Sequence, residues 1–201
     1  MIKIAITGSI ASGKTTASEI LSYKRGPLFS ADNEIKKLYK DKNFKNYLIK
    51  KFLIRKNSNL KYSLILKIFE DKKNLIKLEK IIHPQVRKRM KMFSIKNKNK
   101  NKIFYEIPLL FENKLTKYFD VIIFIKTSKT TRLKRFKSRG GDKNLFNILD
   151  KRQLSDKKKS KLSDHIIINE KNFYVLKKNL LDIISLYEWG FPRYRNNRSI
   201  L

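Results

Sequence analysis

The sequence predicts an α/β fold in which a five-stranded parallel sheet carries helices on both faces. Five short apolar runs bounded by polar or turn residues are typical of buried parallel strands, and apolar residues at helical spacing fill the stretches between them. A glycine-rich segment follows the first apolar run directly, as it does where a strand turns into a helix in doubly wound sheets. We therefore expect a series of right-handed strand-helix-strand units.

The strands are expected, in order along the chain, at Ile2–Thr7, Pro27–Ser30, Ile103–Ile107, Val121–Ile125 and His165–Ile168. Two intervals are too long for a single crossover helix. They divide the chain into a core (1–32, 103–126 and 163–187), a helical insertion (33–102), a lid (127–162) and a basic-aromatic tail (188–201).

Each long interval has its own helical pattern. In the insertion, an apolar stripe through Leu75, Leu78 and Ile82 precedes His83 and Pro84, and we expect a second helix to begin at that proline. The lid is strongly basic, and adjacent glycines at 140–141 separate its two helical segments.

Composition limits the class of protein. The chain has 201 residues, 41% of them hydrophobic, which is enough for a sizeable core, and it has no cysteine for a disulfide framework or a thiolate metal site. The start of the chain does not resemble an export signal, and the longest apolar run, Val121–Ile125, is far too short to cross a bilayer. We expect a soluble cytoplasmic protein without a membrane partner, either a monomer or a weak oligomer.

The net charge of +32 by itself suggests a nucleic-acid partner. However, 38 of the 49 basic residues are lysines, which spread along the whole chain together with many Asn and Ile, as AT-rich codon usage would produce. Arginine is the better residue for bidentate phosphate contacts. We therefore expect no specific nucleic-acid partner, although non-specific binding and RNA stacking by the aromatic residues of the tail stay open.

The segment Gly8–Thr15 matches the phosphate-binding loop motif G-x-x-x-x-G-K-[ST] in full, between a predicted strand and a predicted helix. Its glycines let successive backbone N–H groups converge on phosphates. Lys14 would reach the β- and γ-phosphates and the Thr15 hydroxyl would ligate Mg²⁺. The motif therefore predicts ATP as co-substrate and Mg²⁺ as cofactor.

Two acidic residues follow predicted strands at the edge where ligands of such sheets bind. Asp32 comes directly after the second strand and is either a proton acceptor or an N-cap of the next helix. Glu106 ends the third strand and is either a holder of metal-bound water or an exposed strand-end residue.

Three lid arginines, Arg132, Arg135 and Arg139, fall within an arc of about 60° on a helix that advances about 100° per residue. They are either a clamp on the transferring phosphoryl group or a solvated face. His83 and His165 are expected to be structural on residue type alone.

Several segments together resemble the dephospho-CoA kinase family. They are Ile6–Thr15, Ser30–Asp32, Phe69–Asp71, Leu78–Glu79, His83–Pro84, Ile107–Asn113, Arg132 with Arg135, Gln153, Ser163–Asp164 and Asn169. The resemblance spans about residues 2–169 and implies a P-loop kinase fold. It also implies transfer of the ATP γ-phosphate to the ribose 3′-hydroxyl of dephospho-CoA, with Asp32 as general base.

The resemblance and the motifs together give the candidate residues. The catalytic candidates are Asp32, Lys14 and Arg135, and the metal candidates are Thr15 and Glu106. Nucleotide-binding candidates are Gly8, Ser9, Ile10, Ala11, Ser12, Gly13, Lys14, Thr15, Thr16, Arg132, Arg139 and Asn169. Acceptor-binding candidates are Asp32, His83, Pro108, Leu109, Leu110, Glu112 and Asn113.

The sequence departs from the family pattern at Ser30, where a first Asp is usual, at Ala11 in place of a Gly, and at Lys61 in place of an Arg. The alternative function is phosphorylation of another nucleoside or nucleotide on the same fold. A less favoured alternative is an RNA-associated protein whose P-loop serves as a switch.

Overall fold

A computed structural model describes residues 1–55, 59–188 and 199–200, which form two compact units. The first unit, called the sheet unit here, comprises Met1–Ser30 and Asn97–Leu201, and the second, the helical unit, comprises Ala31–Lys96. The helical unit corresponds to the predicted insertion at 33–102, but it begins two residues earlier and ends six residues earlier. The chain crosses from one unit to the other directly at the end of the second strand.

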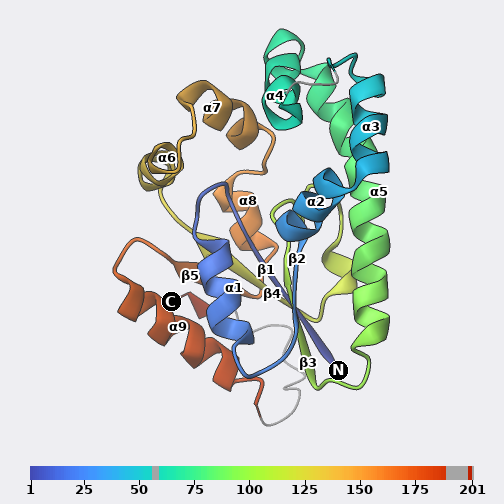
Figure 1. Cartoon of the computed structure of the whole chain (residues 1–201). Coiled ribbons are helices and arrows are strands. Elements are labelled where there is room, and N and C mark those ends of the chain that lie inside the picture. The colour runs from blue at the N-terminus through green and yellow to red at the C-terminus, as the bar shows by residue number, and fades with distance from the viewer. Residues whose placement is uncertain (56–58, 189–198, 201) are drawn as a thin grey trace. The chain divides into compact units, whose positions relative to one another are not determined.

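The sheet unit is built on a parallel sheet (Figure 1). Its strands are β1 (Ile2–Gly8), β2 (Leu28–Ser30), β3 (Lys102–Glu106), β4 (Val121–Lys126), β5 (His165–Ile168) and β6 (Ser199–Ile200). They lie in the order β2-β3-β1-β4-β5-β6, and every pair is parallel. The five predicted strands are confirmed, and β6 adds a two-residue edge strand that the sequence did not predict. The rest of the tail, at 189–198 and 201 and including its aromatic residues, lies outside the described residues.

One face of the sheet carries α1 (Lys14–Ser22) and α9 (Phe173–Ser185), which lie side by side (Figure 1). Ile4 and Ile6 of β1 point into this layer and pack with Leu21 of α1 and Leu180 of α9, all fully buried. Alternate residues on the opposite face, among them Tyr105 and Phe124, are buried as well. Because both faces are covered, the strands are almost continuously apolar, which is why they were readable in the sequence.

The lid interval contains three short helices: α6 (Lys129–Ser138), α7 (Lys143–Lys151) and α8 (Asp156–Lys161). Each begins after a side chain that caps its first N–H groups: Ser128, Asp142 and Ser155, respectively. Gly140 follows α6 with a φ of +78°, which confirms the predicted break between two helical segments. A 3₁₀ turn, η1 (Thr116–Tyr118), precedes β4.

The helical unit contains α2 (Ala31–Lys40), α3 (Lys42–Lys51), α4 (Leu60–Glu70) and α5 (Lys73–Lys96). Asp41 caps α3 and Asn59 caps α4. The predicted break at His83 and Pro84 is wrong, because α5 continues through the proline.

The apolar stripe explains why α5 is not interrupted. Leu75, Leu78, Ile82 and Met90 are all buried along this helix, on both sides of Pro84. A proline inside a helix costs about 3 kcal/mol, whereas burying one large aliphatic side chain contributes about 1.5–3 kcal/mol. The packing of the continuous stripe therefore outweighs the lost hydrogen bond.

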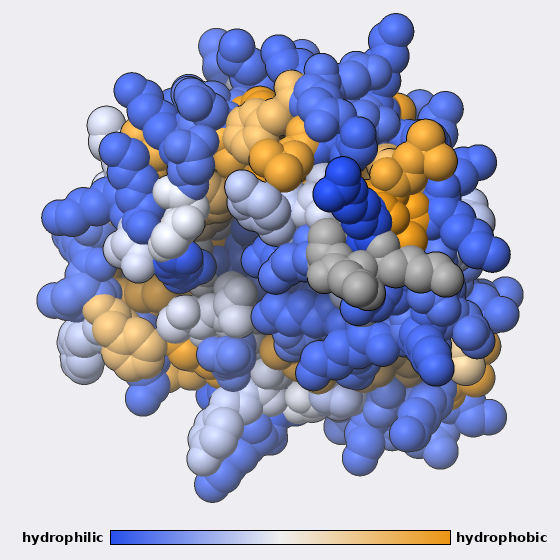
Figure 2. Space-filling model, turned by 45° about the horizontal axis from the view of Figure 1, so that its top comes forward, coloured by the Kyte–Doolittle hydropathy of each residue, from blue (hydrophilic) through white to orange (hydrophobic). Residues whose placement is uncertain are grey.

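The basic side chains lie at the surface. Figure 2 shows a face covered largely by hydrophilic residues, with smaller hydrophobic patches between them. Among the lysines in the described part of the chain, only Lys14 and Lys159 are buried. No helix within the described ranges is long and apolar enough to span a membrane.

Candidate active site

The glycine-rich loop connects β1 to α1 at the carboxyl end of the sheet. Gly13 immediately precedes α1 with a φ of +95°, and Ala11 also has a positive φ, +59°. A Cβ atom on Gly13 would lie only 2.3 Å from Asn169 Nδ2, so the close approach of the two segments requires glycine. No side chain caps α1, which leaves its first N–H groups for an anion.

The carbonyl of Ser12 is held by three side chains from outside the loop. It accepts hydrogen bonds from Asn169 Nδ2 (2.8 Å), from Thr127 Oγ1 (3.0 Å) and, at longer range, from Arg135 (3.5 Å). The Ser12 hydroxyl, in contrast, is buried and has no hydrogen-bond partner among the described residues. A buried hydroxyl without a partner is costly, so this group fits a phosphate oxygen as its missing acceptor.

Lys14 is buried at the start of α1, and its ammonium donates to the carbonyl of Ser9 at 3.0 Å. Ser9 belongs to the same loop, so the lysine folds over the loop from which it emerges. This position is suited to a cation that contacts phosphates held by the loop.

Glu106 connects the predicted metal residues. Its carboxylate is buried at the end of β3, where Oε1 accepts from Thr15 Oγ1 at 2.6 Å and Oε2 accepts from Ser30 Oγ at 2.7 Å. The alternative of an exposed strand-end residue is therefore wrong. Ser30, which stands where the family usually has Asp, gives Glu106 a neutral donor instead of a second carboxylate.

A carboxylate beside a hydroxyl is the donor set that Mg²⁺ takes together with phosphate oxygens. Within the described ranges, no three His, Cys, Asp or Glu side chains cluster as a metal site would require. The side chains of Thr15 and Glu106 therefore fit a metal that binds mainly through the nucleotide phosphates, as Mg²⁺ does in kinases.

The three lid arginines do not act as one set in this structure. Arg132 is buried, where it donates to the Thr127 carbonyl (3.1 Å) and to Asp150 (2.6 Å) and lies over the Phe146 ring. Burial alone would raise the pKa of Asp150, but hydrogen bonding to Arg132 and its charge hold that pKa below its usual value.

The other two arginines differ from Arg132 in their surroundings. Arg135 donates to the carbonyls of Ser12 and Asn169 and so reaches the phosphate-binding loop. Arg139 is exposed and lies just beyond the end of α6. The structure thus brings Arg135 and Asn169 to the loop and places Arg139 apart from it.

The candidates that follow β3 have mixed positions. The Pro108 carbonyl accepts from Thr7 at 3.5 Å, and Asn113 donates to the Leu109 carbonyl within its own turn. Leu110 is fully buried. The Glu112 carboxylate makes polar contacts with a distant segment, the Leu154 N–H and Lys159 of α8.

In the helical unit, Asp32 is the second residue of α2 and is exposed. Asp32 lies inside the first turn of α2, where the helix dipole favours a carboxylate. It is therefore not the N-cap of this helix. His83 lies in the middle of α5, half-buried, and so is not the linker histidine that the predicted break implied.

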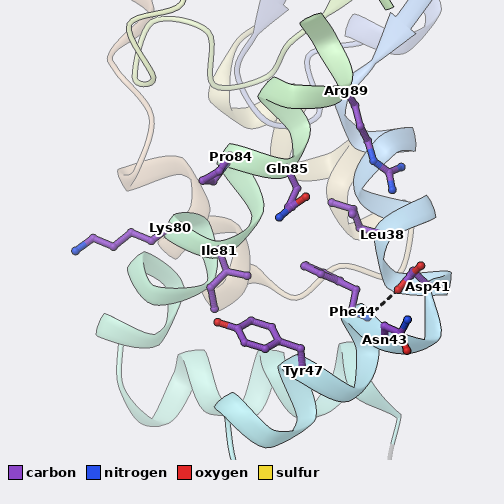
Figure 3. A pocket seen from close by; sticks show the side chains of 10 residues that line it. All are labelled: Leu38, Asp41, Asn43, Phe44, Tyr47, Lys80, Ile81, Pro84, Gln85 and Arg89. Carbon is purple, nitrogen blue, oxygen red and sulfur yellow. Dashed lines mark hydrogen bonds between the residues drawn. The ribbon is translucent and has the colours of Figure 1, made fainter. Parts of the chain in front are cut away.

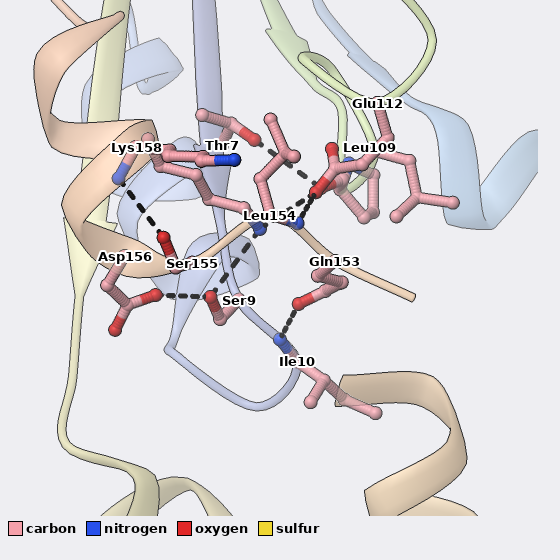
Figure 4. Close-up of polar contacts among 12 residues, drawn as sticks. Thr7, Ser9, Ile10, Leu109, Glu112, Gln153, Leu154, Ser155, Asp156 and Lys158 are labelled. Atoms are coloured by element: carbon pink, nitrogen blue, oxygen red, sulfur yellow. Dashed lines mark hydrogen bonds and ion pairs between the residues drawn. The ribbon is translucent and has the colours of Figure 1, made fainter. Parts of the chain in front are cut away.

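Side chains at the end of the lid contact the phosphate-binding loop, and the sequence did not predict these contacts. Gln153 Oε1 accepts from the Ile10 N–H at 2.9 Å, and Asp156 Oδ1 accepts from Ser9 Oγ at 2.6 Å (Figure 4). Gln153 was noticed only through the family resemblance. Asp156 and Lys159 carried no signal, because they lie in a basic stretch that resembles any exposed helix.

The helical unit has a pocket of about 620 Å³ between α2, α3 and α5 (Figure 3). Phe44, Tyr47 and Ile81 give it an apolar wall, and Gln85 and Arg89 supply polar groups. Arg89 is held by an ion pair with Glu34 at 2.9 Å. An apolar wall with a few polar groups at one side is typical of small-molecule sites.

The parallel sheet, the curled loop at the end of β1 and the lysine folded over that loop define a P-loop kinase. A family model described as dephospho-CoA kinase matches residues 2–174. The chain belongs to the dephospho-CoA kinase family.

Individual proteins agree with this assignment. The chain is 36% identical over 195 residues to the dephospho-CoA kinase of Rickettsia typhi, covering 94% of this chain and 98% of the relative. The solved structure of dephospho-CoA kinase from Campylobacter jejuni is 28% identical with a TM-score of 0.63, over 91% of this chain and 95% of that one. The structure of TT1252 from Thermus thermophilus, at 24% identity and a TM-score of 0.73 over 92% and 97% of the two chains, has the same fold.

Proposed function

We propose that this protein transfers the γ-phosphate of ATP to the ribose 3′-hydroxyl of dephospho-CoA, giving coenzyme A and ADP. The observation that carries the proposal is the phosphate-binding loop, with its buried Lys14 and the Thr15–Glu106 pair, in a chain of this family. Because the reaction consumes ATP, we also propose a cytoplasmic location.

Nucleotide binding rests on residues of the loop. The ammonium of Lys14 and the N–H groups at the start of α1 hold the phosphates, and the Ser12 hydroxyl donates to one of their oxygens. Arg135, which already donates to the Ser12 carbonyl, is the lid residue best placed to stabilise charge on the transferring group.

Thr15 and Glu106 would hold Mg²⁺, which when bound would neutralise part of the negative charge of the phosphates. The Thr15 hydroxyl would supply a ligand to the metal, and the Glu106 carboxylate, which accepts a hydrogen bond from that hydroxyl, would orient it. Ser30 keeps the second oxygen of Glu106 in place.

Asp32 accepts the proton of the acceptor hydroxyl. As that oxygen forms a bond to the γ-phosphorus, the bond from phosphorus to the bridging oxygen of ATP breaks and ADP leaves. The proton moves to the Asp32 carboxylate, so the charges balance. Asp32 is suited to this step by its place in the chain. It comes two residues after Ser30, the last residue of β2, which pairs with Glu106 of β3.

We propose that the pocket of the helical unit binds the acyclic arm of the acceptor. The apolar wall suits methylene and gem-dimethyl groups, while Gln85 can pair with an amide of the arm. His83 and the segment Pro108–Asn113 remain candidates for binding the acceptor.

The test is ADP release with ATP and Mg²⁺ in the presence of dephospho-CoA, adenosine, nucleoside monophosphates or no acceptor. We expect turnover only with dephospho-CoA and its loss in Asp32→Asn, with Asp71→Asn as an exposed control in the same unit. Turnover with another nucleoside would favour the alternative acceptor. No acceptor-dependent turnover would contradict the proposal and favour the RNA-associated alternative.

A second test addresses the pocket. Gln85→Glu places a negative charge against an anionic acceptor and should raise the KM for dephospho-CoA several-fold, leaving the KM for ATP unchanged. Met92→Glu introduces the same charge at an exposed position of α5 outside the pocket and should change neither constant. Equal effects of the two substitutions would exclude the pocket.

A further inference from the structure

Lys159 is buried in a protein whose lysines are almost all exposed. Among the described residues it shares this burial only with Lys14, the lysine of the phosphate-binding loop, and its side chain has no exposed surface. Burial lowers the pKa of Lys159, and the charge of Glu112 opposes that effect. A buried ammonium is costly unless it is paired, so its retention calls for a reason.

The contacts of Lys159 join three segments that are far apart in the sequence. From α8, its ammonium lies 3.2 Å from Glu112 Oε1, in the segment after β3, and 3.5 Å from Ser9 Oγ, in the phosphate-binding loop. The same Glu112 oxygen accepts from the Leu154 N–H at 2.7 Å, and Asp156 accepts from Ser9 (Figure 4). Lys159, Asp156 and Glu112 thus form one polar network around the Ser9 hydroxyl.

Ser9 connects this polar network to Lys14. Its side chain is held by α8, while its carbonyl accepts from the ammonium of Lys14 at 3.0 Å. A shift of the Ser9 backbone would move the carbonyl oxygen that accepts the hydrogen bond from Lys14. A displacement of about 1 Å at a reacting site can lower the rate about 100-fold. A buried lysine that fixes the position of Ser9 would therefore support catalysis.

We infer that Lys159 is a positioning residue. Through its contacts with Glu112 and Ser9 it fixes the position of Ser9, and thereby the conformation of the phosphate-binding loop and the position of Lys14. This role rests on the proposed function, since it concerns how the loop binds ATP. The Lys159 side chain has no exposed surface, so its effect on the nucleotide is exerted through Ser9. Helix α8, at the end of the lid, thereby sets the geometry of the nucleotide site.

The experiment measures the affinity for a fluorescent ATP analogue with Mg²⁺ in the absence of acceptor, and then the KM for ATP and for dephospho-CoA. Lys159→Met removes the charge at nearly constant volume. Lys157→Met is the matched control on the same helix, because Lys157 is exposed. Thermal denaturation first defines a temperature at which every variant is folded.

We expect Lys159→Met to weaken ATP binding and raise the KM for ATP at least about fivefold, with the KM for dephospho-CoA nearly unchanged. Lys157→Met should stay within about twofold of the parent. An ATP affinity of Lys159→Met within twofold of the parent would overturn the inference.

The double variant Lys159→Met/Glu112→Gln separates positioning from stability. It removes both buried charges, so it should recover much of the stability lost in Lys159→Met, while ATP affinity stays low because Ser9 has still lost its contact with Lys159. Recovery of both quantities together would show a purely structural role and overturn the inference.

Ser9→Ala covers the case in which Lys159→Met does not fold. It removes the hydroxyl on which the network acts but keeps the Lys159–Glu112 pair, and it should weaken ATP binding to a similar extent. Parental affinity in Ser9→Ala would overturn the inference. If the parent binds ATP and the variants lose this binding, but no acceptor turns over, the proposed acceptor fails and the positioning role stands.

Discussion

Gly13→Ala tests the close packing of the phosphate-binding loop against Asn169. Two separate costs follow from the structure. The positive φ of +95° disfavours any residue with a Cβ, at about 1–2 kcal/mol, of which about 0.4–1 kcal/mol is recovered through the less flexible unfolded chain. The new Cβ would also lie 2.3 Å from Asn169 Nδ2 and displace it.

The second cost is the larger one. Asn169 Nδ2 donates to the Ser12 carbonyl at 2.8 Å in a buried position, and losing a buried hydrogen bond costs about 1–3 kcal/mol. The sum is a destabilisation of about 2–4 kcal/mol for Gly13→Ala. For a chain of this length, that lowers Tm by roughly 4–16 °C.

Gly140→Ala is the matched control. Gly140 also has a positive φ, +78°, but a Cβ on it would meet no atom within 4 Å. This variant therefore carries only the conformational cost, about 1 kcal/mol or less. Urea denaturation without nucleotide measures both variants, and equal losses of stability would refute the reasoning from close packing.

Three further predictions concern single side chains. Ala11→Gly removes the strain of a φ of +59° and should raise the free energy of unfolding by about 0.5–1 kcal/mol in urea denaturation. Burial lowers the pKa of His165, against the opposing charge of a neighbouring aspartate. The unfolded chain therefore binds more protons, and stability should fall as pH drops below about 6.5, a loss that His165→Gln should reduce. Arg132→Lys should lower the free energy of unfolding by about 1–3 kcal/mol, because lysine cannot keep both hydrogen bonds of the buried guanidinium. Arg139→Lys, at an exposed position, should lower it by less than about 0.5 kcal/mol.

Features carried by local sequence were predictable. The strands are visible because both faces of the sheet are covered, and the phosphate-binding loop because its backbone requires glycine at fixed positions. Glu106 was found by its place at the end of an apolar strand. The path of α5 through Pro84 was not predictable in this way, because the packing of a continuous buried stripe outweighs the proline signal.

The side chains that surround the loop were harder to identify. Lys159 and Arg132 look like any other basic residue in a chain with a net charge of +32, and their burial depends on partners 47 and 18 positions away, Glu112 and Asp150. Arg139 was grouped with Arg132 and Arg135 by helical periodicity, but α6 ends one residue before it.

The sequence by itself determined the class of fold, the phosphate-binding loop and the family, because strand periodicity and glycine-dependent backbone geometry are local properties of the chain. Only the tertiary structure decided which carboxylate meets Thr15, which carbonyls Arg135 reaches and which lysine is buried beside Ser9. These contacts join the phosphate-binding loop and α1 to β3 and the lid across many residues. Their energies depend on burial and distance, which the order of residues along the chain does not specify.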